Sequence, residues 1–90
     1  NRVFILRPDG SVERVITRFH KPMAIWGDAE DRLYITDLTP ALHCLTAEGA
    51  HLGRARPALN GAHGICGDSQ GRIYLAEGNP NRVLCMRPLL

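Results

Sequence analysis

Short apolar runs separated by turn-forming residues extend along the whole chain. The run Met23–Trp26 ends in Gly27-Asp28, and after a short turn the segment Arg32–Asp37 resumes with alternating apolar and polar positions. Such alternation, rich in β-branched and aromatic residues, is typical of strands, and aspartate at the turn favours a tight connection between antiparallel strands. The pattern predicts a β-hairpin over residues 23–37.

A second hairpin is predicted ahead of this one. In Arg2–Arg7 both alternating sets of residues are apolar, which favours a strand covered on both faces. A Pro8-Asp9-Gly10 turn follows, and Val12–Thr17 then alternates between apolar and polar residues. We therefore expect paired strands over residues 2–17.

The hairpin pattern of residues 23–37 occurs twice. Residues Lys21–Asp37 and Gly61–Glu77 align at an offset of 40 residues with five of 17 positions identical. Conservative replacements accompany them, such as Asp37 against Glu77. The identical pairs are Ile25/Ile65, Gly27/Gly67, Asp28/Asp68, Arg32/Arg72 and Tyr34/Tyr74.

An independent correspondence gives the same spacing. Asn1–Pro8 and Asn81–Pro88 share Asn, Arg, Val, Arg and Pro at an offset of 80 residues. The segment Ala41–Gly49 occupies the middle position, with Glu48-Gly49 aligned to Asp9-Gly10. Two correspondences thus agree on a period near 40 residues, which is typical of repeat architectures.

Each repeat reads as four short antiparallel strands, which predicts an all-β fold made of β-propeller blades. Residues 1–19 supply the end of one blade, 20–59 a complete blade, and 60–90 most of a third, about two and a quarter blades in all. Because such a set cannot close into a ring alone, we expect a fragment of a longer chain or a homo-oligomer. The predicted partners are therefore the remaining blades.

One segment carries a competing signal. Thr39-Pro40, followed by apolar residues and ending at Gly49, is typical of a capped helix with proline in its first turn and a glycine stop. The repeat predicts a strand at the same place, since the corresponding residues in the other copies alternate. We expect the strand.

Composition narrows the classes of function. The chain has 90 residues, is 44% hydrophobic and carries a net charge of +2, so it fits one small globular domain. Neither a strong basic excess nor an apolar run of about 18 residues is present, and we expect no nucleic-acid or membrane partner. The three cysteines, Cys44, Cys66 and Cys85, form no CxxC pair and lie among apolar neighbours, so they are predicted to be buried.

The repeated sequence resembles the NHL repeat. Residues 60–88, which read NGAHGICGDSQGRIYLAEGNPNRVLCMRP, match the pattern best, and residues 20–49 match more loosely. The resemblance implies a six-bladed propeller that acts as a scaffold binding a small molecule, peptide or protein at its channel. Similar propellers include lactonases and lyases, so the fold leaves an enzymatic alternative open.

The alternative rests on one histidine. Ala62-His63-Gly64 resembles the Pro-His-Gly openings that supply zinc ligands in peptidyl-α-hydroxyglycine α-amidating lyases, which are similar six-bladed propellers. The resemblance implies that His63 is a metal ligand and zinc the cofactor, with the other ligands on other blades. Met23 occupies the equivalent position of the preceding repeat. The catalytic residues of that family have no assignable counterpart, and a lactonase-type hydrolase fits less well because its opening carries Asn.

The remaining polar residues are given structural roles. Asp28 and Asp68 are expected to bond their turns, and His43 and His51 to be surface or sheet residues. Residues that recur in both repeats are expected to make contacts between blades, because a single-site function does not need a copy in every blade. These are the pairs Arg32/Arg72, Tyr34/Tyr74 and Asp37/Glu77.

Overall fold

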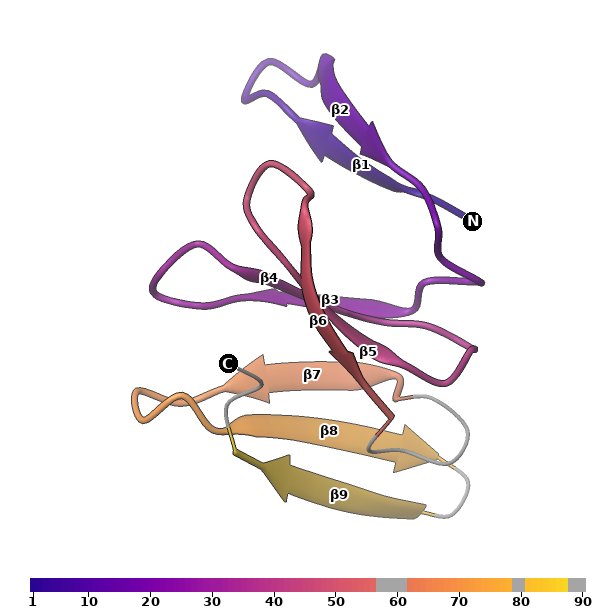
Figure 1. The fold of residues 1–90 in the computed structure, drawn as a ribbon, viewed down its shortest axis with the longest axis vertical. Helices are drawn as coiled ribbons and strands as arrows, with labels where there is room; N and C mark the ends of the chain where they lie inside the picture. Colours follow the sequence, from indigo (N-terminus) through magenta and orange to yellow (C-terminus); the bar gives the residue numbers. More distant parts are fainter. Residues whose placement is uncertain (57–61, 79–80, 88–90) are drawn as a thin grey trace.

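Nine strands and no helix make up the part of the chain that the computed structural model describes, residues 1–56, 62–78 and 81–87 (Figure 1). In the N-terminal sheet β1 (Val3–Leu6) pairs with β2 (Val12–Ile16). The central sheet has the order β3 (Ala24–Gly27), β4 (Leu33–Thr36), β5 (Leu42–Leu45) and β6 (His51–Ala55). The C-terminal sheet has the order β7 (Gly64–Gly67), β8 (Ile73–Gly78) and β9 (Asn81–Met86).

The prediction of an all-β fold with antiparallel strands is confirmed. Residues 42–45 form β5, so the helix signal at Thr39–Gly49 is wrong; paired on both sides by β4 and β6, the segment satisfies its backbone within a sheet. The predicted boundary between residues 59 and 60 lies outside the described residues. Among the described residues, no helix is long and apolar enough to span a membrane.

The two copies of the hairpin turn share one hydrogen-bond pattern. In the first, Asp28 Oδ1 accepts bonds from the backbone N–H groups of Glu30 and Arg32, both at 2.9 Å. Asp28 Oδ2 accepts bonds from Arg32 Nε at 2.7 Å and from the Tyr34 hydroxyl at 3.0 Å. One carboxylate therefore organises the whole turn, as expected for the aspartate of a tight turn.

The second turn is built in the same way. Asp68 accepts bonds from the backbone N–H groups of Gln70 and Arg72, from Arg72 Nε at 2.7 Å and from the Tyr74 hydroxyl at 2.8 Å. The prediction that these aspartates bond their turns is confirmed. The prediction that the arginines pair between sheets is wrong, because each guanidinium reaches the aspartate four residues before it in its own turn.

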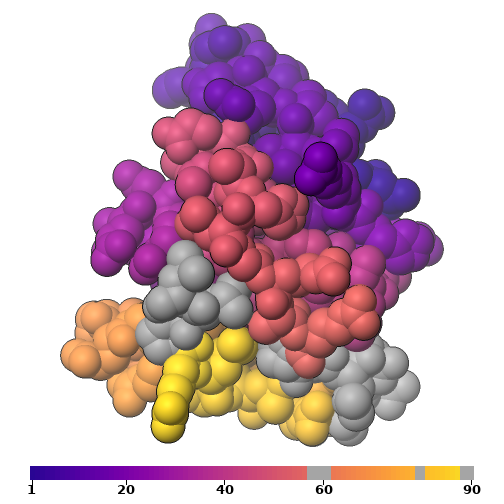
Figure 2. All heavy atoms as spheres, in the orientation of Figure 1, coloured from indigo at the N-terminus to yellow at the C-terminus, as the bar shows by residue number. Residues whose placement is uncertain are grey.

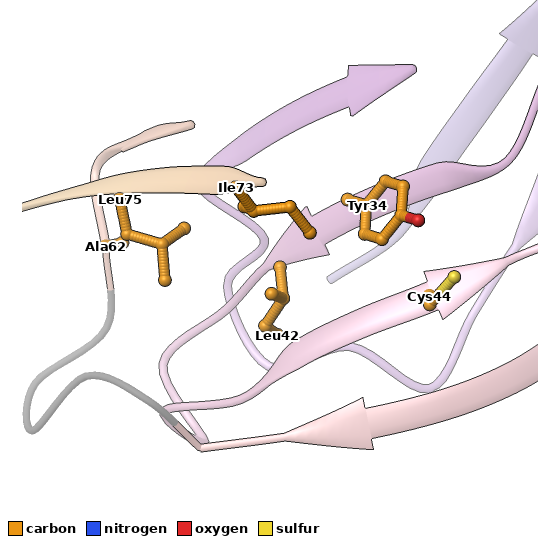
Figure 3. Close-up of a cluster of buried hydrophobic side chains, with 6 residues drawn as sticks. All are labelled: Tyr34, Leu42, Cys44, Ala62, Ile73 and Leu75. Carbon is orange, nitrogen blue, oxygen red and sulfur yellow. The ribbon is translucent and has the colours of Figure 1, made fainter. Parts of the chain in front are cut away.

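The central and C-terminal sheets pack face to face through a buried apolar cluster (Figure 3). Tyr34, Leu42 and Cys44 contribute from the central sheet, and Ala62, Ile73 and Leu75 from the other side. Tyr34 thus packs between two sheets, as predicted, while its hydroxyl returns to Asp28 in its own sheet. Removing such apolar side chains from water is the main favourable term in this interface.

The N-terminal and central sheets are joined by a second cluster. Its buried members are Ile16 and Phe19, from β2 and the residues after it, and Ile35 and Leu45 of the central sheet. Val3, Ile5 and Leu33 pack around them. The three sheets therefore follow one another in chain order, each packed on the next (Figure 1).

Both outer faces of this stack expose apolar side chains. On the N-terminal sheet Phe4 and Leu6 are 50% and 56% exposed, and on the C-terminal sheet Val83 is 72% exposed. Cys66 and Cys85 are also exposed, so the prediction of three buried cysteines is right only for Cys44. The two thiols alternate onto the face of the C-terminal sheet that turns away from the central sheet, flanking Tyr74 in register.

Candidate functional site

The histidine singled out as a metal ligand lies at the start of a strand. His63 directly precedes β7 and is exposed, and its backbone N–H donates to the Ala76 carbonyl at 2.9 Å. Met23 makes the same bond ahead of β3, donating to the Thr36 carbonyl at 2.8 Å. The two residues are therefore structurally equivalent, as their alignment predicts.

His63 does not by itself make a zinc site. Structural and catalytic zinc ions take three or four protein ligands. Within residues 1–56, 62–78 and 81–87, no group of three or more His, Cys, Asp or Glu side chains is arranged to hold a metal. The assignment of His63 as a ligand remains a prediction that needs further ligands from outside these residues.

A different cluster of polar groups lies between the N-terminal and central sheets, and Asp37 is its innermost member. The Asp37 carboxylate is fully buried and accepts bonds from the Thr39 hydroxyl and from the backbone N–H groups of His20, Thr39 and Ala41. Burial opposes ionisation, but these bonds and one from His43 outweigh it and hold the pKa of Asp37 at about 2. Asp37 is therefore a carboxylate at neutral pH.

His43 connects Asp37 to the second member of the cluster. His43 Nε2 lies 2.9 Å from Asp37 Oδ2, and the ring is almost completely buried, perpendicular to the Phe19 ring at a centroid distance of 5.1 Å. Because an ionised carboxylate can only accept, His43 carries a proton on Nε2. In the neutral ring, His43 Nδ1 is then an acceptor.

His51 completes the chain toward solvent. Its Nε2 lies 3.3 Å from His43 Nδ1, so the three side chains run in sequence from the buried carboxylate to an exposed residue. Burial lowers the pKa of His51, and the positive charges of Arg18 and Arg54 lower it further. Asp37, His43 and His51 are called the Asp–His–His chain below.

A β-bulge places His51 in this position. β5 and β6 pair His43 with Arg54 and Cys44 with Gly53, but the register then shifts and Leu45 pairs with His51. Leu52 is the extra residue. Strict alternation would put His51 on the face opposite to Arg54, whereas the shift brings both onto the face that carries His43 and Leu45.

The Asp–His–His chain opens into a hollow of about 420 Å³. The hollow is lined by Arg18, His43, His51, Leu52, Gly53 and Arg54. A neighbouring hollow of about 350 Å³ shares Arg18 and His51 and also contacts Arg14 and Glu48. Figure 2 shows β6 on the surface of the molecule, between the N-terminal sheet and the yellow residues of β9. We call the first of these two spaces the arginine–histidine hollow.

Sequence reasoning missed this cluster. His43 was expected to be a surface or sheet residue, and it is buried because β5 is the third strand of a four-stranded sheet that is covered on both faces. Asp37 was expected to pair between sheets, but apart from the His20 backbone its partners are in or next to β5. The available signal was the alignment itself, in which His43 falls where the other copies have Phe4 and Leu84.

The equivalent acid in the C-terminal sheet has a different partner. Glu77 Oε1 accepts a bond from Arg82 Nε at 2.6 Å, between the adjacent strands β8 and β9. This bond lies within one sheet, and the expected contact of Glu77 between sheets stays a prediction. At the position of His43, β9 carries Leu84, so Glu77 has no histidine in the place that His43 takes beside Asp37.

No protein-family model matches this sequence, and a search of curated protein sequences gives no significant match.

Proposed function

We propose that this chain is part of an NHL-type β-propeller that serves as a scaffold for binding a small molecule, peptide or protein. The contact between β3 and β7, the first strands of two repeat-related sheets, carries the proposal. In a propeller the first strands of successive blades surround a central channel. The matching backbone bonds at Met23 and His63, just before these strands, support placing the ligand-binding face there.

The apolar outer faces support the same proposal. Phe4 and Leu6 at one end and Val83 at the other are exposed to an extent that is unusual for large apolar residues gathered on a sheet face. In the proposed propeller these faces are covered by the remaining blades. The blades come either from further residues of the same protein or from other copies of this chain.

Thiol reactivity tests this proposal in the native protein. Cys66 and Cys85 lie on the outer face of the C-terminal sheet, which a further blade would cover, and Cys44 is the buried reference thiol. We expect Cys66 and Cys85 to be alkylated about as slowly as Cys44 until urea is added, with the sites assigned by peptide mass spectrometry. A monomer by light scattering that melts cooperatively while both thiols react at the rate of a free thiol would overturn the proposal.

A zinc-dependent lyase of the amidating type is the second candidate. The exposed imidazole of His63 at the start of β7 favours it, because that end of the strand would face the channel. The test is the zinc content of the purified protein and of its His63→Ala variant, with His20→Ala, another exposed histidine, as the control. Zinc lost only from the His63 variant supports this candidate, and zinc that is absent or fully retained removes it.

A further inference from the structure

We propose that the arginine–histidine hollow binds a phosphate group through Arg18, His51 and Arg54. The site lies between β6 and the residues that follow β2, whereas the ligand face proposed above lies at the starts of β3 and β7. The proposal rests on the side chains of the hollow and on the packing of two sheets. It therefore stands or fails separately from the propeller proposal.

The charge of the hollow is positive. Arg18 and Arg54 supply two guanidinium groups, and none of the described residues that line it is acidic. Asp37 is separated from it by His43 and is bonded to its own donors, and Glu48 lines the neighbouring hollow together with Arg14. Guanidinium groups bind phosphate through paired N–H donors, so two of them at one hollow suit a doubly charged oxyanion.

The Asp–His–His chain gives His51 a defined donor and acceptor arrangement. When His43 is neutral with its proton on Nε2, His43 Nδ1 accepts and His51 Nε2 donates to it across 3.3 Å. The other ring nitrogen, Nδ1, is then the one left for the hollow that His51 lines. Protonation at Nδ1 turns His51 into a cation with one N–H held by His43 and the second free for a phosphate oxygen.

Binding and protonation are therefore coupled. The groups that face His51 are His43 of β5, Arg54 of β6 and Arg18 after β2, with Arg14 and Glu48 across the neighbouring hollow. Without a ligand, burial and the positive charges of Arg18 and Arg54 favour neutral His51. A bound phosphate offsets that positive charge, so it raises the pKa of His51 and takes up a proton.

The backbone beneath Arg18 is unusual. Arg18 has a φ of 75°, and like Lys21 and Asp31 it adopts a left-handed conformation that costs free energy in a non-glycine residue. Phe19, the next residue, is buried against His43 and anchors this backbone. The strained residue is thus the one that places a guanidinium beside the hollow.

The same positions in the N-terminal sheet do without polar groups. His43 and His51 align with Phe4 and Val12 of the N-terminal sheet, where the same bulge occurs between Ile5 and Leu6. Phe4 and Val12 are both about half exposed, so the fold does not require a polar pair at these positions. Burying an imidazole costs free energy unless its bonds are met. His43 serves the buried Asp37 carboxylate, whereas His51 makes no bond to that carboxylate and is the imidazole that a ligand-binding role explains.

The proposal is tested by titrating the protein with inorganic phosphate. Binding is followed by calorimetry and by NMR of the His51 ring. We expect saturable binding, an upward shift of the His51 pKa and proton uptake that varies with the buffer. Arg54→Gln and His51→Gln should each weaken binding about tenfold or more. Arg87→Gln, which removes an equal charge from an exposed residue at the end of β9, should leave it within about twofold.

A second variant separates binding from folding. Arg18→Gly removes the guanidinium and relieves the left-handed strain, so we expect it to melt at a higher temperature than the native protein while binding phosphate more weakly. Three results would each overturn the proposal. They are an equal loss of phosphate affinity in Arg18→Gly and Arg87→Gln, binding that does not saturate, and an unchanged His51 pKa. The titration is then repeated with glycerol phosphate. If it binds more tightly than inorganic phosphate, the ligand is a phosphate ester, and if it binds more weakly, the ligand is the free ion.

Discussion

The indole ring of Trp26 lies directly over the backbone of Gly67, where a Cβ atom would fall 2.1 Å from the ring carbon Cη2. Trp26 extends from β3 of the central sheet, and Gly67 ends β7 of the C-terminal sheet. Because Gly67 has no side chain, β7 leaves room for the indole ring of Trp26 from β3. This contact joins the first strands of two sheets.

Gly67→Ala should destabilise the protein by about 1–3 kcal/mol, because the new methyl group must displace a packed aromatic ring. Gly27→Ala is the matched control, since Gly27 ends β3 at the equivalent place and its nearest neighbour to an added Cβ lies at 3.9 Å. Urea unfolding measures both. Equal effects of the two substitutions would contradict the packing described for Trp26.

A second glycine pair separates backbone strain from crowding. Gly10 and Gly49 occupy equivalent turns with φ values of +90° and +97°. An added Cβ meets nothing within 4 Å at Gly10, but at Gly49 it falls 3.0 Å from Ile16 Cγ1. Gly10→Ala should therefore cost about 1–2 kcal/mol for the left-handed conformation alone.

Gly49→Ala should cost more than Gly10→Ala in the same thermal or urea unfolding experiment, because Ile16 belongs to the buried cluster that joins the N-terminal and central sheets. The difference between the two values measures this contact. A Gly49 variant no less stable than the Gly10 variant would mean that β2 does not pack on the turn between β5 and β6.

Replacing His43 by leucine, the residue at its aligned position in β9, should destabilise the protein by about 1–3 kcal/mol. The buried Asp37 carboxylate would lose a donor that it cannot replace with water. His51→Val, which copies the aligned residue Val12, is the control and should change stability little because His51 is exposed. A neutral His43→Leu variant would show that the Asp37–His43 bond contributes nothing to folding.

Acid should weaken the fold partly through Asp37. Its pKa is lowered from 3.8 to about 2 in the folded state, so folding favours the ionised form. The resulting stabilisation is fully present above the ordinary value and is lost as the pH falls through the folded value. We expect the free energy of unfolding to decline between about pH 4 and pH 2, measured by urea titration at each pH.

Asp37→Asn should reduce the slope of this decline without abolishing it, because the pKa of Asp28 and that of Asp68 are also lowered by bonds to their turns. Asp31→Asn, with an exposed side chain at a left-handed turn position that asparagine tolerates, should leave the slope unchanged. An identical acid decline in the native protein and the Asp37 variant would contradict the role assigned to this carboxylate.

Local features were accessible from the sequence. The strands at residues 33–36 and 73–78 follow from alternation, and the turns at Asp28 and Asp68 follow from residues that bond to the backbone a few positions away. Each of these needs only neighbours in the chain. The repeat also placed a strand at residues 42–45 against a local helix signal, because equivalent segments must fit equivalent sheets.

Side-chain partners were less accessible. Arg32 and Arg72 were expected to pair between sheets because they recur, yet recurrence is equally satisfied by a bond within each turn. Cys66 and Cys85 were expected to be buried because their neighbours are apolar. Apolar neighbours show that a segment is a strand, but they do not show which face of it is covered.

The chain's own pattern determined three antiparallel hairpin-based sheets and the aspartates that close their turns, because hydrogen bonding and alternation act over a few residues. Tertiary structure alone decided the Asp–His–His chain. A single extra residue, Leu52, reverses the side on which His51 projects, and this shift depends on how β6 pairs with β5. Only the packing of the N-terminal sheet then brings Arg18 and Phe19 to the same place, since no local pattern links residues 18 and 51.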